Sequence, residues 1–119
     1  MKKKKKILVV EDEANLCLLY REELTKEGYE VTAVTNAQRA LDLIKKGDFD
    51  LIITDIRMPA KDGVELIGEV MQIRRDIPVI INTAYESYRY DFLTWAADAY
   101  LIKSASLKEL KAKIKELIG

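Results

Sequence analysis

The chain has 119 residues and 49% of them are hydrophobic, which is enough for one domain that buries its own core without a disulfide or a structural metal. Its 20 basic and 20 acidic residues cancel, so the basic surface that nucleic-acid binding requires is missing and we expect no direct nucleic-acid partner. No apolar run reaches the ~18 residues that a membrane helix requires, and no secretory hydrophobic segment follows Met1. We therefore expect a cytoplasmic protein that does not enter a membrane.

Five short apolar runs alternate with segments of helical periodicity, a pattern typical of repeated βα units built around a parallel sheet. The expected strands, in chain order, are Ile7–Val10, Tyr29–Val34, Leu51–Thr54, Val79–Asn82 and Ala99–Ile102. We therefore expect a single α/β domain over residues 1–119, which either stands alone or was cut from a longer protein.

Helix signals fall between these strands. The first helix has an apolar stripe formed by Leu16, Leu19, Tyr20 and Leu24. The expected helix boundaries are Gly28 after the first helix, Asn36 and Gly47 around the second, and Gly63 and Asp76 around the third. The last helix has Ser106 as its expected N-cap, because Glu109 follows three residues later at the capping-box spacing.

Polar residues stand where four of the expected strands end. They are Glu11 and Asp12, then Asp55, then Thr83, then Lys103. Because the carboxyl ends of the strands of an open parallel sheet meet at one crevice, we expect these side chains to converge there. Acids repel phosphate unless a cation intervenes, and Mg²⁺ binds carboxylates, water and phosphate oxygens. The pattern therefore predicts a site for Mg²⁺ and phosphoryl transfer.

The segment that follows the third expected strand gives this site a more specific interpretation. Asp55 directly follows the apolar run and is followed by Met58-Pro59 and then by Asp62-Gly63. Together with the first acidic pair, the Thr83-Ala84 step and the run from Ala97 to Lys103, the chain resembles the CheY-like receiver domains of response regulators in two-component signalling. The resemblance spans nearly the whole chain and implies a flavodoxin-like, doubly wound (βα)5 fold with the strand order 2-1-3-4-5.

The resemblance also implies a role for each residue of the site. Asp55 would be the nucleophile that accepts a phosphoryl group from a phosphohistidine of a partner sensor histidine kinase or phosphotransfer protein. Asp12, Asp55 and the backbone carbonyl of Arg57 would hold Mg²⁺, while Glu11 would act through water. Lys103 would pair with the phosphoryl oxygens as a point charge.

On the same resemblance the domain is a two-state signalling switch whose only catalysis is its own phosphorylation and dephosphorylation. The phosphoryl group would draw Thr83 inward and open space that Tyr100 could fill. The signal would reach a second copy of the chain, or another partner, through the face built from the fourth helix, the fifth strand and the start of the fifth helix. Arg57 and Tyr85 flank the path of the attacking water, so we expect a long-lived phosphoryl state.

Three departures from the family pattern follow the fourth strand. Ser104 stands where the family usually has proline after a cis bond, and a cis bond before serine would cost ~2.5–4 kcal/mol. Ala96 replaces a usual glycine, and the stretch from Thr83 to Tyr100 is slightly shorter than usual, so we expect a short or irregular fourth helix. Because this stretch is rich in aromatic residues, we interpret it as an interaction surface.

Three other functions compete with this interpretation. A haloacid-dehalogenase-type phosphatase needs an acid two residues after its nucleophile, where this chain has Arg57. A flavodoxin-like flavin carrier needs a hydroxyl- and glycine-rich phosphate loop, where this chain has Glu11-Asp12-Glu13. A degenerate receiver, which binds partners without being phosphorylated, stays open because of Ser104 and the short fourth helix.

Overall fold

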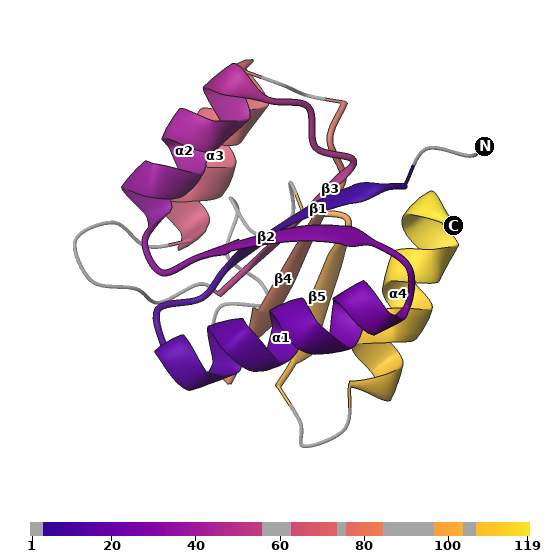
Figure 1. Cartoon of the computed structure of the whole chain (residues 1–119). Helices are drawn as coiled ribbons and strands as arrows, with labels where there is room; N and C mark the ends of the chain where they lie inside the picture. The colour runs from indigo at the N-terminus through magenta and orange to yellow at the C-terminus, as the bar shows by residue number, and fades with distance from the viewer. Residues whose placement is uncertain (1–3, 56–62, 74–75, 85–96, 104–106) are drawn as a thin grey trace.

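The computed structural model describes residues 4–55, 63–73, 76–84, 97–103 and 107–119. Five parallel strands form one sheet in the order β2-β1-β3-β4-β5 (Figure 1). The strands are β1 (Lys6–Val10), β2 (Glu30–Val34), β3 (Leu51–Thr54), β4 (Val79–Thr83) and β5 (Ala99–Ile102). The strands expected from the sequence are confirmed with shifts of no more than one residue at their ends, and the doubly wound strand order is confirmed as well.

The described helices cover both faces of this sheet (Figure 1). One face packs against α1 (Ala14–Lys26) and α4 (Lys108–Ile118), and the other packs against α2 (Ala37–Lys46) and α3 (Gly63–Ile73). The helix expected between β4 and β5 falls on residues 85–96, outside the described residues. The label α4 therefore belongs to the helix after β5, which is the fifth helix expected from the sequence. None of the helices in the described part of the chain is both long enough and apolar enough to cross a membrane.

The helix ends show which local signals the fold uses. Gly28 has a φ of +100°, the left-handed conformation that ends α1, as expected. Asn36 caps α2, and its side chain accepts a hydrogen bond of 2.8 Å from the backbone N–H of Arg39. The expected N-cap of the last helix was wrong by one residue, since the N-cap of α4 is Leu107, whose side chain makes no capping hydrogen bond. Ser106 itself lies outside the described residues.

Strand alternation divides the core into two layers, which we name after the helices that cover them. On β1, Leu8 and Val10 pack in the α2/α3 layer, while Ile7 and Val9 pack in the α1/α4 layer. Helices cover both faces, so the middle strands β1 and β3 are largely continuous apolar runs, whereas the edge strand β2 includes Glu30 and Thr32. The same alternation determines toward which layer the side chain of the residue directly after a strand points.

Helix α1 buries a slightly different stripe from the expected one. Cys17, Tyr20 and Leu24 are buried, whereas Leu19 is 40% exposed. The buried positions are three and four residues apart, so they form a single face toward the sheet, and Leu19 lies to its side. The hydroxyl of Tyr20 is therefore carried into the α1/α4 layer.

Candidate functional site

The site is built from residues that come immediately after three of the strands. Glu11, Asp55 and Lys103 follow β1, β3 and β5 directly. Each keeps its backbone N–H in the ladder of the sheet, with bonds to the carbonyls of Val34 (3.0 Å), Val10 (3.1 Å) and Thr83 (2.7 Å) respectively. The sheet thus fixes the backbone of all three residues, although they lie outside the strands.

The side chains of Glu11, Asp55 and Lys103 point to the same face of the sheet, because side chains alternate along each strand. The residues two positions before them all pack in the α1/α4 layer: Val9, Ile53 and Leu101. A residue two positions further along an extended chain points to the same face, so Glu11, Asp55 and Lys103 converge above that layer. Asp12, one residue out of phase with Glu11, is exposed.

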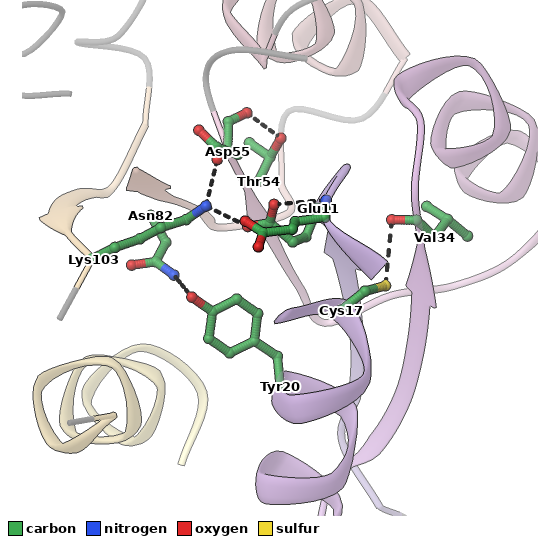
Figure 2. Close-up of polar contacts among 9 residues, drawn as sticks. Glu11, Cys17, Tyr20, Val34, Thr54, Asp55, Asn82 and Lys103 are labelled. Carbon is green, nitrogen blue, oxygen red and sulfur yellow. Dashed lines mark hydrogen bonds and ion pairs between the residues drawn. The ribbon is translucent and has the colours of Figure 1, made fainter. Parts of the chain in front are cut away.

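The Lys103 ammonium lies between two buried carboxylates (Figure 2). Its Nζ is 2.5 Å from Glu11 Oε1 and 2.6 Å from Asp55 Oδ2. Glu11 is 2% exposed and Asp55 is 6% exposed, so both ion pairs are largely removed from water. The other oxygen of Glu11, Oε2, accepts a bond of 3.1 Å from the backbone N–H of Glu13. These contacts hold the three charges in a fixed arrangement.

The charges of the site shift each other's pKa values. Burial raises the pKa of Glu11 above its ordinary value, although the bonds from Lys103 and from the Glu13 N–H oppose the shift. Burial alone would lower the pKa of Lys103, but its hydrogen bonds to Asp55 and Glu11 outweigh burial and raise it. Lys103 therefore stays charged throughout the physiological range.

Three carboxylates at this edge form a candidate metal site. Oxygens of Glu11, Asp12 and Asp55 all lie within 4.8 Å of one another. One ammonium neutralises only part of their charge, and hard carboxylate oxygens are ligands that suit Mg²⁺, so the donor set fits this ion. The fourth expected ligand, the backbone carbonyl of Arg57, lies outside the described residues, as do Tyr85 and the bond between Lys103 and Ser104.

The expected switch residues lie on the other side of the sheet. Thr83 ends β4 and is fully buried, and its carbonyl accepts the backbone N–H of Lys103. Tyr100 is half-buried in the α2/α3 layer. The register pairs Ile81 with Tyr100 and Thr83 with Ile102, so Thr83 and Tyr100 face the same layer from neighbouring strands. Their roles in switching remain predictions.

Sequence reasoning missed a polar contact beside the site. Asn82 Nδ2 donates a bond of 3.1 Å to the hydroxyl of Tyr20, and both side chains are buried (Figure 2). The sequence placed Tyr20 in an apolar helical stripe and Asn82 at the end of a strand, with nothing to join them. An amide that interrupts an otherwise apolar strand was the available signal, because a buried amide needs a hydrogen-bond partner.

Solved structures of other proteins are similar to this chain in fold and in sequence. The crystal structure of response regulator TrrA from Thermotoga maritima in complex with Mg²⁺-BeF is 46% identical, with a TM-score of 0.93, over 96% of this chain and 99% of that one. A structure of histidine kinase ThkA in complex with TrrA matches at 45% identity and a TM-score of 0.90, over 97% of this chain and 99% of that one.

Curated proteins and a family model agree with these structures. The probable transcriptional regulator ycf27 of Porphyra purpurea is 37% identical over 97% of this chain and 48% of its own length. Response regulator ArlR of Staphylococcus aureus is 37% identical over 94% of this chain and 52% of its own length, so the chain spans about half the length of these curated relatives. The model of the response regulator receiver domain matches residues 7–115, and the chain belongs to this family.

Proposed function

We propose that this domain is a phosphorylation-dependent switch that accepts a phosphoryl group on Asp55 from a partner histidine kinase. The observation that carries the proposal is the buried Asp55 carboxylate at the carboxyl end of β3, paired with Lys103 and clustered with two further acids. A carboxylate held in this way is an oriented nucleophile beside a cation that can take up phosphoryl charge. The TrrA structures, one with Mg²⁺-BeF and one with a histidine kinase, support the same reaction for this chain.

In the proposed reaction an oxygen of Asp55 attacks the phosphorus atom of a phosphohistidine. The new O–P bond forms as the N–P bond breaks, and the imidazole nitrogen leaves with the bonding electron pair. Lys103 already donates to Asp55 Oδ2, so a small movement brings its ammonium to the incoming phosphoryl oxygens. The phosphoryl group then draws Thr83 inward from the end of the neighbouring strand β4, so that its hydroxyl donates to the same oxygens. The layer that Thr83 shares with Tyr100 passes the change toward β5.

The carboxylates supply the metal site of the same reaction. Asp12, Asp55 and the Arg57 carbonyl are the proposed direct ligands, with Glu11 acting through water. When bound, Mg²⁺ offsets the negative charge that gathers as the phosphoryl group meets the carboxylates. The proposed location is the cytoplasm, and the proposed route to a second copy or an output partner includes β5 and the start of α4.

Intact-mass measurement after incubation with acetyl phosphate tests the proposal. We expect the mass of one phosphoryl group to be added when Mg²⁺ is present and not when the metal is chelated. Asp55→Asn should abolish this addition. The matched control is Asp50→Asn, because Asp50 stands at the opposite end of the same strand and accepts a backbone hydrogen bond that an asparagine oxygen can keep.

Labelling of the Asp55 variant to the wild-type level would overturn the assignment of the nucleophile. A wild-type chain that gains no mass with Mg²⁺, either from acetyl phosphate or from a phosphorylated kinase, would favour the degenerate receiver instead. In that case its function would be partner binding without phosphorylation.

A further inference from the structure

The hydrogen bond between Tyr20 and Asn82 has no part in the phosphoryl-transfer reaction described above. Tyr20 is 3% exposed and Asn82 is 6% exposed, and they lie in a layer that otherwise holds mainly aliphatic side chains. A polar pair in such a layer adds desolvation that an aliphatic pair of the same shape would avoid. Its position therefore calls for an explanation other than stability.

The sheet places this pair under Lys103. Asn82 lies opposite Leu101 in the β4–β5 register, and Lys103 comes two residues after Leu101, so Asn82 and Lys103 are diagonal neighbours on the same face. Figure 2 shows the Asn82 amide below the aliphatic stem of Lys103, with the Tyr20 ring reaching up from α1 to meet it. Tyr20 and Asn82 therefore lie between α1 and the stem of Lys103.

A small pocket of about 10 Å³ lies beside the pair, lined in part by Tyr20, Asn82 and Leu101. This is about the least volume that admits a single water, so the pair is closely packed on that side. A lysine stem has four carbons and many rotamers, so the two ion pairs hold the ammonium more firmly when the surface beneath the stem is itself fixed. Lys103 contacts two carboxylates at once, and these follow two different strands.

We propose that Tyr20 and Asn82 are positioning residues, whose hydrogen bond fixes the surface beneath Lys103 and so places its ammonium between Glu11 and Asp55. The ammonium position does not depend on any reaction, but its kinetic consequence rests on the proposed function. The competing explanation is that the bond merely attaches α1 to the sheet. The two explanations differ in whether Lys103 responds when the hydroxyl is removed.

The Lys103 ammonium can be observed directly in the metal-free protein by ¹H–¹⁵N NMR, with Lys103→Met to assign its signal. Tyr20→Phe removes the hydroxyl and keeps the ring, and we expect the ammonium protons to exchange with water about 3- to 10-fold faster as the stem gains freedom. The matched control is Tyr29→Phe, a second buried tyrosine in the same layer but near the amino end of β2. This control should leave the signal unchanged.

Two results of this measurement would overturn the proposal. One is an unchanged exchange rate in Tyr20→Phe, and the other is a wild-type ammonium that exchanges as fast as those of exposed lysines. The double variant Tyr20→Phe with Asn82→Val removes both polar groups and guards against a single variant that fails to fold. It should also accelerate exchange, and a double variant with the wild-type rate would equally overturn the proposal.

Phosphorylation by acetyl phosphate with saturating Mg²⁺ supplies the second measurement. Tyr20→Phe should lower the rate constant about 3- to 10-fold, since small errors in placement are costly to transfer reactions. In the Lys103→Met background it should have no further effect, because the hydroxyl acts through the lysine. An equal loss in both backgrounds would contradict a positioning role. If the wild-type chain is never labelled, the proposed function fails, and the exchange measurement alone decides the inference.

Discussion

Two aspartates bracket strand β3 and lie in opposite electrostatic surroundings. Before the strand, Asp50 Oδ2 accepts a hydrogen bond of 2.7 Å from the backbone N–H of Lys6. The Asp50 N–H returns a bond of 2.7 Å to the Lys6 carbonyl. After the strand, Asp55 is buried and pairs with the ammonium of Lys103 at 2.6 Å.

The direction of the strands explains this difference. A parallel sheet presents backbone N–H groups at the amino ends of its strands and carbonyls at the carboxyl ends. A carboxylate at an amino end, such as that of Asp50, can therefore be satisfied locally by the backbone. A carboxylate at a carboxyl end lies closer to carbonyls and other acids, and there Asp55 pairs with the ammonium of Lys103. The same residue type thus bonds to the backbone at one end of β3 and to a buried ammonium at the other.

Removing the cation should produce the largest effect. Lys103→Met leaves Glu11 and Asp55 buried without its ammonium, so we expect the metal-free protein to lose about 2–4 kcal/mol of unfolding free energy at neutral pH. Urea unfolding followed by circular dichroism measures the loss. The control is Lys111→Met, because Lys111 pairs with Glu23 at 3.2 Å on the surface, where ion pairs contribute little. Equal stability of the two variants would erase the distinction between the ends of β3.

Truncating the two aspartates should have effects of opposite sign. Asp50→Ala leaves the Lys6 N–H without its acceptor, so we expect a loss of about 1–2 kcal/mol. Asp55→Ala removes one of two carboxylates that share a single ammonium, so we expect a gain of up to about 1 kcal/mol, as is common at functional sites. Urea unfolding with the metal chelated compares them. A similar loss in both variants would make Asp55 a structural residue like Asp50.

The smallest effect should come from the pH dependence of Glu11. Burial raises its pKa above 4.5 even though Lys103 opposes the shift. The folded protein therefore keeps a proton that the unfolded chain has released, so unfolding free energy falls as pH rises from about 4.5 through the raised pKa. Glu11→Gln should flatten this slope in metal-free urea unfolding, and Glu22→Gln, an exposed change on α1, should retain it. A wild-type slope in Glu11→Gln would assign the dependence to another group.

The fold was predictable because its signals are local. The strands are short and mostly apolar, and Gly28 and Asn36 mark helix ends through their own backbone and side-chain chemistry. The site was predictable as a location, because parallel strands bring their carboxyl ends together. These predictions require no knowledge of which side chains touch.

The contacts within the site could not be predicted in the same way. Glu11 and Asp12 are adjacent acids, and only the phase of β1 decides that Glu11 turns inward to Lys103 while Asp12 stays exposed. The bond between Tyr20 and Asn82 joins residues 62 positions apart and depends on how α1 lies across β4. The N-cap of α4 was not predicted either, because Leu107 has no polar side chain to mark it as a cap.

The position of β5 at the edge of the sheet has a consequence for folding. Lys103 follows Asp55 by 48 residues and comes directly after β5, which lies at the edge of the sheet. The acids that it joins follow two strands in the middle of the sheet, so the ammonium reaches them only when β5 is paired with the rest of the sheet. The complete charge arrangement exists only after the outermost strand has docked, and it is lost whenever that edge opens. A partner that recognises the joined charges therefore meets only domains whose sheet is whole.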